Sequence, residues 1–257
     1  MHARLHPHFL TCPLAHRTLH DVRFGRPENS VEGAEAAIAA GYGIEIDVQL
    51  SKDGRAMVFH DYGLGRLTAV RGPVRDRTAA ELAEIPLKGG SYPPQTLPAF
   101  LELVAGQVPL LIEVKDQDGA MGHDVGPLEQ AVCAELRGYR GPMAVMSFNP
   151  HSVAKCAELA PDIPRGLVTD PFRTPDWRKV PAGRRAELAA IPDYDHLGAC
   201  FISHNARDLA SPHVRKVREK GGHILCWTVR SAVQEKKARR IADNITFEGY
   251  HALKTGG

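Results

Sequence analysis

Three acidic residues occur in apolar segments, where a buried charge is costly without a partner. Glu45 and Asp47 alternate with the apolar residues of segment 44–48, so both point to one side of an expected strand. Glu113 lies near the end of another apolar segment, with Lys115 two positions later. Three carboxylates in one pocket would form an all-oxygen site, which Mg²⁺ and Ca²⁺ prefer over zinc or copper sites. The alternative is that Glu113 pairs with Lys115 and the other two acids bond to donors of the fold, without a metal.

Two histidines could act as proton donor and proton acceptor. His16 and His60 each follow a short apolar segment directly, so each is expected at the carboxyl end of a strand. That end is where barrels of alternating strands and helices place their chemistry. An imidazole titrates near neutral pH, and two of them across a pocket can serve as general acid and general base. Of the other histidines, His204 and His223 lie near expected strands and are interpreted as structural or rim residues.

Short apolar segments alternate with helix-length segments along the chain, which is typical of a parallel sheet covered by helices. The expected strands are nine segments, at residues 12–15, 44–50, 56–59, 108–114, 143–148, 166–168, 199–203, 224–229 and 244–247. The expected helices lie at residues 30–40, 98–105, 127–137, 150–160, 211–220 and 231–242. This alternation favours an α/β fold, a (β/α)8 TIM barrel in a single domain over residues 1–257, rather than two domains. The sequence thus offers nine candidate strands, one more than the eight of such a barrel.

Two connections depart from a regular barrel. Residues 51–54 form a tight turn with no room for a helix, so the second and third strands are expected to meet as a hairpin or by an extended return. Residues 63–95 are rich in glycine, proline and charge, and they predict an irregular loop region after the third strand with one short helix at 79–83. We expect this region to pack over one end of the barrel, where long loops commonly select substrates.

The overall composition excludes several classes of protein. With 257 residues, 43% of them hydrophobic, and 32 basic against 30 acidic side chains, the chain is neither a disordered tail nor a polybasic arm for nucleic acid. Its five cysteines are far apart and lack CxxC or CxxH spacing, which indicates a reducing compartment. No apolar run reaches the about 18 residues needed to cross a bilayer. We therefore expect a cytoplasmic protein with no membrane anchor and no nucleic-acid partner.

Short motifs follow one another in a fixed order between about residue 15 and residue 229. They are His16-Arg17-Thr18 and the residues at 27–30, 44–48, 52–54, 58–61, 112–115, 147–148 and 227–229. Together they resemble the motifs of the glycerophosphodiester phosphodiesterase family, which are His-Arg-Gly, Pro-Glu-Asn-Thr, Glu-x-Asp, a turn, Val-x-x-His-Asp, Glu-x-Lys, Ser-Phe and Trp-Thr-Val. A chance assembly of these motifs in this order is very rare, so the resemblance is strong.

The resemblance implies a TIM-type barrel that uses one divalent cation, Mg²⁺ or Ca²⁺, to hydrolyse glycerophosphodiesters to glycerol phosphate and an alcohol. The roles that it implies are general acid and base at His16 and His60, metal ligands at Glu45, Asp47 and Glu113, and substrate contacts at Arg17, Lys115 and Trp227. We favour His60 as the base and His16 as the acid. Arg17 suits a phosphate because a guanidinium fork matches two phosphate oxygens. By similarity, Glu28 and Asn29 hold the first loop in place or touch the ligand, and the first role is favoured.

Three features depart from the family pattern. Thr18 replaces a glycine, and we expect its side chain to narrow the mouth of the site. The loop at 18–26 is longer than in the family, and residues 244–248 lack the Gly-Ile-x-Thr-Asp character of the family's ending.

Two other classes of protein stay open. One is a phospholipase D-type enzyme for lysophospholipid or sphingomyelin, which would need an apolar groove that residues 63–95 do not offer. The other is a non-catalytic barrel that binds phosphorylated metabolites.

Overall fold

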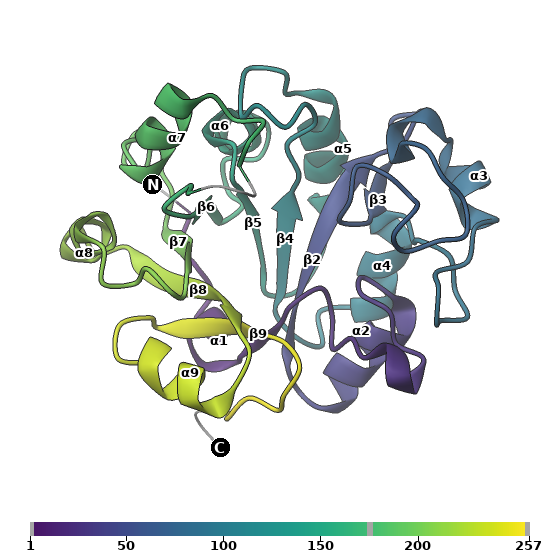
Figure 1. The fold of residues 1–257 in the computed structure, drawn as a ribbon, viewed down its shortest axis with the longest axis horizontal. Helices are drawn as coiled ribbons and strands as arrows, with labels where there is room; N and C mark the ends of the chain where they lie inside the picture. The colour runs from purple at the N-terminus through teal and green to yellow at the C-terminus, as the bar shows by residue number, and fades with distance from the viewer. Residues whose placement is uncertain (1–2, 174–176, 255–257) are drawn as a thin grey trace.

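A closed barrel of eight parallel strands forms the centre of the protein, whose computed structural model describes residues 3–173 and 177–254 (Figure 1). The strands are β1 (Leu14–Ala15), β2 (Gly43–Leu50), β4 (Leu110–Val114), β5 (Met143–Ser147), β6 (Arg165–Thr169), β7 (Phe201–Asn205), β8 (His223–Val229) and β9 (Asn244–Phe247). Each pairs in parallel with the next barrel strand, and β1 closes the cylinder by pairing with both β2 and β9. The predicted TIM barrel is confirmed.

One of the nine expected strands, β3 (Ala56–Val58), lies outside the barrel. It pairs antiparallel with the end of β2 through a hairpin whose turn contains Gly54 at a φ of +76°. His60 therefore does not follow a barrel strand, and that part of the sequence prediction is wrong. The hairpin still returns the chain to the carboxyl end of the barrel, because the Phe59 N–H donates to the carbonyl of Asp47 on β2 (2.9 Å).

Helices surround the barrel, and several begin at a capping side chain. They are α1 (His8–Thr11), α2 (Val31–Ala39), α3 (Ala79–Ala83), α4 (Leu97–Val104), α5 (Pro127–Leu136), α6 (Pro150–Leu159), α7 (Ala182–Ala189), α8 (Pro212–Glu219) and α9 (Ala232–Ala238), with 3₁₀ helices η1 (Val22–Phe24) and η2 (Val74–Asp76). At the start of α2, Ser30 Oγ accepts a hydrogen bond from the Gly33 N–H (3.0 Å). The sequence did not predict α7, because Leu188 is its one buried residue and it lacks an apolar stripe. Among the residues that the structure describes, no helix is both long enough and apolar enough to span a bilayer.

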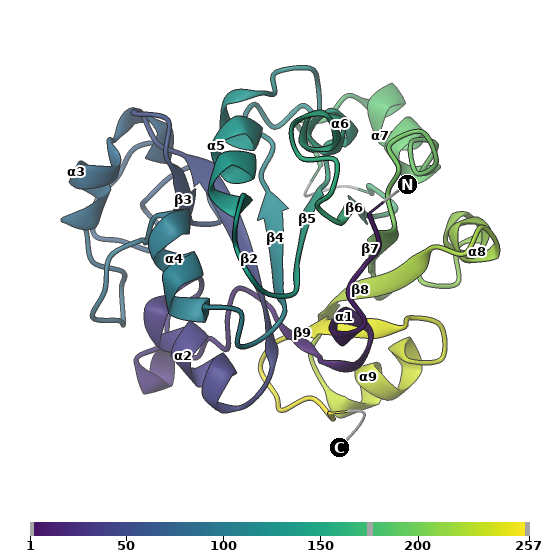
Figure 2. The same ribbon diagram turned by 180° about the vertical axis from the view of Figure 1, so that it is seen from behind.

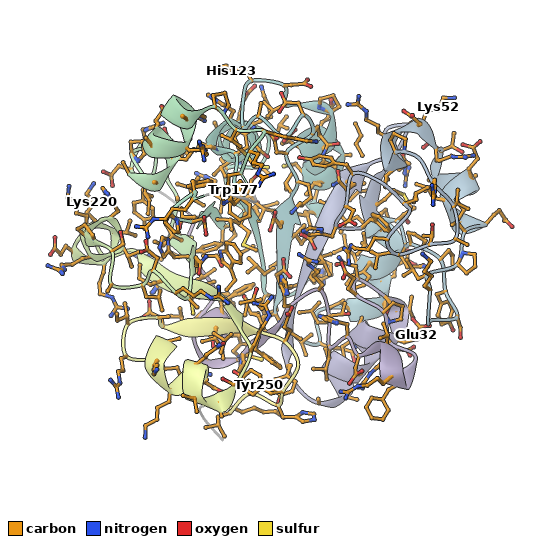
Figure 3. All side chains as sticks on the ribbon, in the orientation of Figure 1. Glu32, Lys52, His123, Trp177, Lys220 and Tyr250 are labelled. Atoms are coloured by element: carbon orange, nitrogen blue, oxygen red, sulfur yellow. The ribbon has the colours of Figure 1, made fainter. Side chains whose placement is uncertain are left out.

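The amino-terminal end of the barrel is closed by α1 and a cluster of apolar side chains. Phe9 of α1 is fully buried and belongs to the same cluster as Leu111 and Phe201, which point inward from β4 and β7. Figure 2 shows α1 at this end of the barrel, beside β8 and β9. Charged side chains such as Lys52 and Lys220 lie at the outside of the molecule (Figure 3). The carboxyl end of the strands is therefore the end at which a ligand can enter.

The irregular region at 63–95 contains the expected short helix, α3, at the predicted residues 79–83. The region does not, however, pack over the end of the barrel. Figure 1 shows α3 beside the ring of helices, next to β3, rather than over the barrel. Leu64 and Leu82 form a separate small core there with Met57 of β3. No residue of 63–95, all of which the structure describes, lines the central cavity. The segment therefore supports β3 from outside, and the expectation that it covers one end of the barrel is wrong.

Candidate active site

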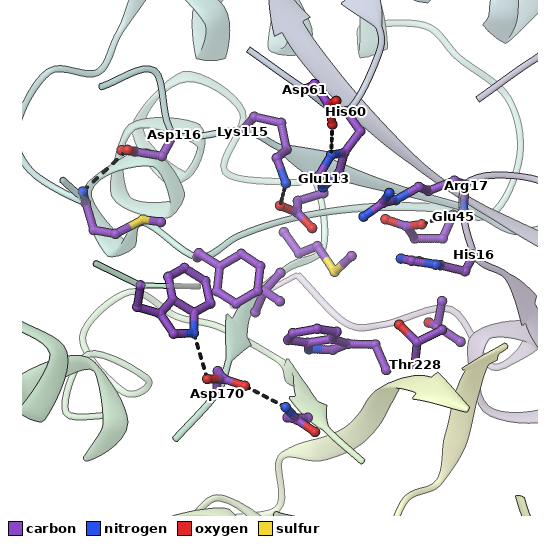
Figure 4. A pocket seen from close by; sticks show the side chains of 18 of the residues that line it. His16, Arg17, Glu45, His60, Asp61, Glu113, Lys115, Asp116, Asp170 and Thr228 are labelled. Carbon is purple, nitrogen blue, oxygen red and sulfur yellow. Dashed lines mark hydrogen bonds and ion pairs between the residues drawn. The ribbon is translucent and has the colours of Figure 1, made fainter. Parts of the chain in front are cut away.

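A cavity of about 700 Å³ opens at the carboxyl end of the barrel (Figure 4). The predicted site residues that line it are His16, Arg17, Glu45, His60, Glu113, Lys115 and Trp227. Asp47 is buried and is not one of the lining residues, but its carboxylate contacts the side chains of Lys115 and Arg17, which are. The ends of β1, β2, β4 and β8 and the return from β3 position these side chains. The structure thus brings all eight predicted site residues to one place.

The three acidic residues form one cluster between two neighbouring strands. Asp47 on β2 lies opposite Glu113 on β4, and Glu45 precedes Asp47 by two positions on the same side of β2. A carboxylate oxygen from each of the three lies within 4.8 Å of the other two. All three side chains are buried. The shared face that the spacing predicted is therefore present.

Two cationic side chains compensate part of this charge. Lys115 Nζ lies 2.7 Å from Glu113 Oε1 and 3.4 Å from Asp47 Oδ1. Arg17 Nε lies 3.4 Å from Asp47 Oδ2, and the Arg17 backbone N–H donates to Glu45 Oε2 (2.8 Å). The ion pair between Glu113 and Lys115, which the sequence offered as an alternative to a metal, is therefore real. These two cations still face three carboxylates.

Glu45 is the carboxyl group of the cluster whose charged form is least favoured. Burial raises the pKa of this carboxyl group well above its usual range, and the neighbouring Asp47 and Glu113 raise it further. Burial alone would also raise the pKa of Asp47, but His60, Lys115 and Arg17 outweigh it and hold that pKa well below its usual range. A buried excess of negative charge, in a set made only of oxygen donors, fits a hard divalent ion such as Mg²⁺ or Ca²⁺.

Each of the two site histidines is held by a carboxylate through the same ring nitrogen. His16 Nδ1 lies 2.6 Å from Glu248 Oε2, and His60 Nδ1 lies 2.7 Å from Asp61 Oδ1. Both contacts leave Nε2 as the ring nitrogen that can meet a substrate. Burial lowers the pKa of His16, and the bond to Glu248 offsets part of this effect. Two oriented imidazoles at one cavity are an arrangement suited to acid–base chemistry.

A chain of ion pairs holds the first loop against the site. Glu28 accepts hydrogen bonds from Arg17 Nη1 (3.1 Å) and from Arg66 Nη1 (2.7 Å). Arg66 Nε also donates to Asp61 (2.7 Å), so the same network reaches the partner of His60. Asn29 Nδ2 donates to Asp47 Oδ2 (3.0 Å) and fixes that carboxylate. The contacts of Glu28 and Asn29 are those of residues that hold the loop in place.

Three polar residues next to His16, namely Glu248, His20 and Arg230, were not predicted from the sequence, and of these Arg230 lines the cavity. Glu248 Oε2 lies between His16 and His20, and Arg230 Nε lies 2.5 Å from Glu248 Oε1. Glu248 directly follows β9 at the place where the chain departs from the family's ending. A polar residue just after a predicted barrel strand is the signal that identified His16, and the same signal would have found Glu248.

The side of the cavity away from the carboxylates is aromatic. The ring of Phe148 lies 4.8 Å from that of Trp177 and 5.5 Å from that of Trp227, measured between centroids. Asp170 fixes Trp177 by accepting a hydrogen bond from its Nε1 (2.8 Å). Figure 3 places Trp177 over the middle of the barrel. Phe148 also lines the cavity, which therefore has a charged side and an apolar side.

Thr18 does not narrow the mouth of the cavity, so that expectation is wrong. Its side chain is 1% exposed and does not line the cavity. It points instead at α2, where a Cβ added to Gly33 would overlap both Oγ1 and Cβ of Thr18. The threonine at 18 and the glycine at 33 therefore fit one another. Thr18 also adopts a φ of +74°, a conformation that β-branched residues rarely take.

This fit predicts a stability effect that its partner should reverse. Replacing Gly33 with alanine is expected to destabilise the protein by about 1–3 kcal/mol, because the added methyl overlaps a side chain that cannot move away. The double variant Thr18→Gly/Gly33→Ala should recover most of this loss, which denaturant unfolding of the four combinations would measure. Equal destabilisation of Gly33→Ala in both backgrounds would contradict the proposed contact.

Comparison with known proteins gives one consistent result. The model of the Glycerophosphoryl diester phosphodiesterase family matches residues 16–245. The uncharacterized protein YqiK of Bacillus subtilis (strain 168) is 32% identical over 151 residues, which are 56% of this chain and 61% of YqiK. A glycerophosphodiester phosphodiesterase of the same organism is 31% identical over 241 residues, covering 84% of this chain and 76% of that protein. The structure of an Oleispira antarctica phosphodiesterase in complex with the product sn-glycerol-3-phosphate shares the fold, with a TM-score of 0.75 at 22% identity over 93% of each chain.

Proposed function

Because this chain belongs to the glycerophosphoryl diester phosphodiesterase family, we propose that it hydrolyses glycerophosphodiesters to glycerol phosphate and an alcohol in the cavity at the carboxyl end of its barrel. Family membership makes it a phosphoric diester hydrolase. One observation carries the mechanism that we propose. His16 and His60 line the same cavity as Glu45 and Glu113, which with the buried Asp47 form a cluster of three carboxylates beside only two cationic side chains.

The charge of the phosphodiester must be neutralised before a nucleophile can approach phosphorus. Glu45, Asp47 and Glu113 would hold one divalent cation, Mg²⁺ or Ca²⁺, which when bound would withdraw charge from the phosphate oxygens. Arg17 lines the cavity and binds Glu28 through Nη1, so the other arm of its guanidinium fork can meet a phosphate oxygen. Lys115 adds a second positive charge beside the carboxylates. These residues bind the substrate's charged end, opposite the aromatic side.

The two histidines would transfer the protons. His60 Nε2 would accept the proton of the attacking group, either the 2-hydroxyl of the glycerol or a water molecule. His16 Nε2 would donate a proton to the departing alcohol, which then leaves as a neutral molecule. If the glycerol hydroxyl attacks, a cyclic phosphate forms first. Glu248 stabilises the protonated form of His16 by its 2.6 Å contact with Nδ1, and Asp61 orients His60 in the same way.

Replacing Glu248 with glutamine is expected to lower kcat/KM by about 10- to 100-fold, less than loss of the imidazole itself. Burial lowers the pKa of His16 and Glu248 partly restores it, so that pKa falls further in the variant. A general acid must be protonated, so the alkaline limb of the kcat/KM profile should move to lower pH. The kcat/KM of Glu248→Asp should lie between those of wild type and Glu248→Gln. An unchanged profile in Glu248→Gln would show that His16 does not donate the proton.

A second candidate function is the hydrolysis of lysophospholipids. One observation favours it, namely the apolar side of the cavity. That side is made of Met121, Met146, Phe148, Val168, Trp177, Val180 and Trp227. The apolar surface needed by an acyl chain is thus present, although it lies inside the barrel mouth and not in segment 63–95.

A substrate panel separates these functions. Purified protein would be incubated with glycerophosphocholine, glycerophosphoethanolamine and lysophosphatidylcholine, and release of the alcohol would be measured. We expect a higher kcat/KM for the two simple diesters. A preference for the lysolipid would support the second candidate, and turnover of none of the three would leave a barrel that only binds phosphorylated metabolites.

We also propose that the protein works in a reducing compartment such as the cytoplasm, since all five cysteines are free thiols.

A further inference from the structure

A histidine outside the catalytic pair has a buried nitrogen with no hydrogen-bond partner. His20 Nε2 is enclosed, makes no hydrogen bond among residues 3–173 and 177–254, and lies 3.7 Å from Glu248 Oε2. On the other side, Oε2 meets His16 Nδ1 at 2.6 Å. One ligand atom from each of the three residues lies within 4.8 Å of the others, in a group that shares no member with the three carboxylates.

The fold brings these three side chains together by strand pairing. His16 and Glu248 follow the neighbouring strands β1 and β9, in which Ala15 is paired with Phe247. Arg230 follows β8 and binds Glu248 Oε1, so Oε2 is the oxygen that faces the two imidazoles. His20 reaches Oε2 from the loop between β1 and α2.

We propose that His16, His20 and Glu248 form a second metal site, selective for a borderline divalent ion such as Zn²⁺, and that its occupation inhibits the enzyme. Two imidazoles and one carboxylate are a frequent zinc ligand set, whereas the all-oxygen cluster suits Mg²⁺ or Ca²⁺. Bonds of about 2.1 Å in a tetrahedral site place ligand atoms roughly 3.4 Å apart. The 3.7 Å spacing of His20 and Glu248 is near this value. The His16–Glu248 contact must lengthen by about 1 Å, as the metal replaces the proton between them.

Inhibition would follow from the chemistry of the imidazole. A metal on Nδ1 of His16 leaves the proton on Nε2, and that nitrogen can then neither accept a proton nor release one easily near neutral pH. This consequence rests on the proposed role of His16, whereas binding of the metal does not. The neighbouring Arg17 and Arg230 oppose a cation, and we therefore expect reversible binding rather than a permanently occupied site.

The test compares His20→Asn with wild type in excess Mg²⁺, with Zn²⁺ as the probe. Zinc bound per chain would be measured by competition with a coloured chelator, and hydrolysis of glycerophosphocholine would be followed in parallel. His196→Asn is the matched control, because this histidine is 66% exposed and lies outside the cluster. We expect wild type and control to bind one Zn²⁺ and to lose more than 90% of their activity. His20→Asn should keep full activity with Mg²⁺ and need at least tenfold more Zn²⁺ for both binding and inhibition.

The outcomes separate the site from the proposed function. Equal zinc binding by His20→Asn and wild type would overturn the site and point to the three-carboxylate cluster as the place where zinc binds. Zinc bound in a His20-dependent way without loss of activity would overturn the inhibition and would argue against proton transfer by His16. No turnover in Mg²⁺ alone would refute the proposed function, while the binding experiment would still decide whether the site exists.

Discussion

Replacing His16 or His60 with alanine is expected to lower kcat for glycerophosphocholine by about 10²- to 10⁴-fold in each case, with the barrel still folded. The imidazoles line the cavity and are partly exposed, so their removal leaves the buried core intact. Steady-state kinetics would give kcat, and thermal unfolding would establish that the fold persists. His213→Ala, on the outer helix α8, is the matched control and should keep full activity. Full activity of both site variants would refute the proposed proton transfers.

The same variants also distinguish the acid from the base. A leaving alcohol of low pKa, such as p-nitrophenol, departs without receiving a proton, so loss of the general acid matters less for that substrate. If His16 is the acid, His16→Ala should regain most of its activity on the glycerophospho-p-nitrophenol diester, whereas His60→Ala should stay impaired. The reverse pattern would exchange the two roles. Equal impairment on both substrates would mean that neither histidine acts on the leaving group alone.

The acidic cluster was predictable from the sequence because its geometry is local. Residues two apart on one strand share a face, and this rule alone places Glu45 beside Asp47. The further step to Glu113 required only that the next barrel strand lie beside β2, as it does in the register of Asp47 opposite Glu113. His16 was found in the same way, from the end of β1. Where chemistry depends on strand periodicity, sequence reasoning was sufficient.

The features that were missed depend on contacts between separate segments of the chain. The sequence offered a hairpin as one of two connections between β2 and β3, but an apolar run of three residues does not show whether β3 then joins the barrel or lies outside it. Glu248 contacts His16 across 232 positions of chain because β9 closes the barrel beside β1. The side chain of Thr18 turns away from the cavity because α2 offers the space above Gly33. None of these is set by local propensity, since each depends on how one segment packs against another.

Removing divalent cations with a chelator is expected to abolish measurable turnover, and adding Mg²⁺ or Ca²⁺ is expected to restore it. The reason is that burial and the neighbouring Asp47 and Glu113 disfavour the charged form of Glu45, and a bound cation would stabilise all three carboxylates together with the phosphate. A readout independent of activity is thermal unfolding. A ligand at about 100 times its Kd stabilises the folded state by about 2.7 kcal/mol. For a chain of this length, that free energy corresponds to a rise in Tm of roughly 5–10 °C.

Glu113→Gln should lose both the activity and the cation-dependent rise in Tm, since it removes one ligand charge and the partner of Lys115. Glu158→Gln is the matched control, because that side chain is 67% exposed on the outside of α6, and it should behave as wild type. Full activity in chelator, together with a Tm that does not respond to either cation, would favour the alternative in which Lys115 and Arg17 alone balance the carboxylates. Because two cations face three acids in this cluster, we expect the metal-dependent result.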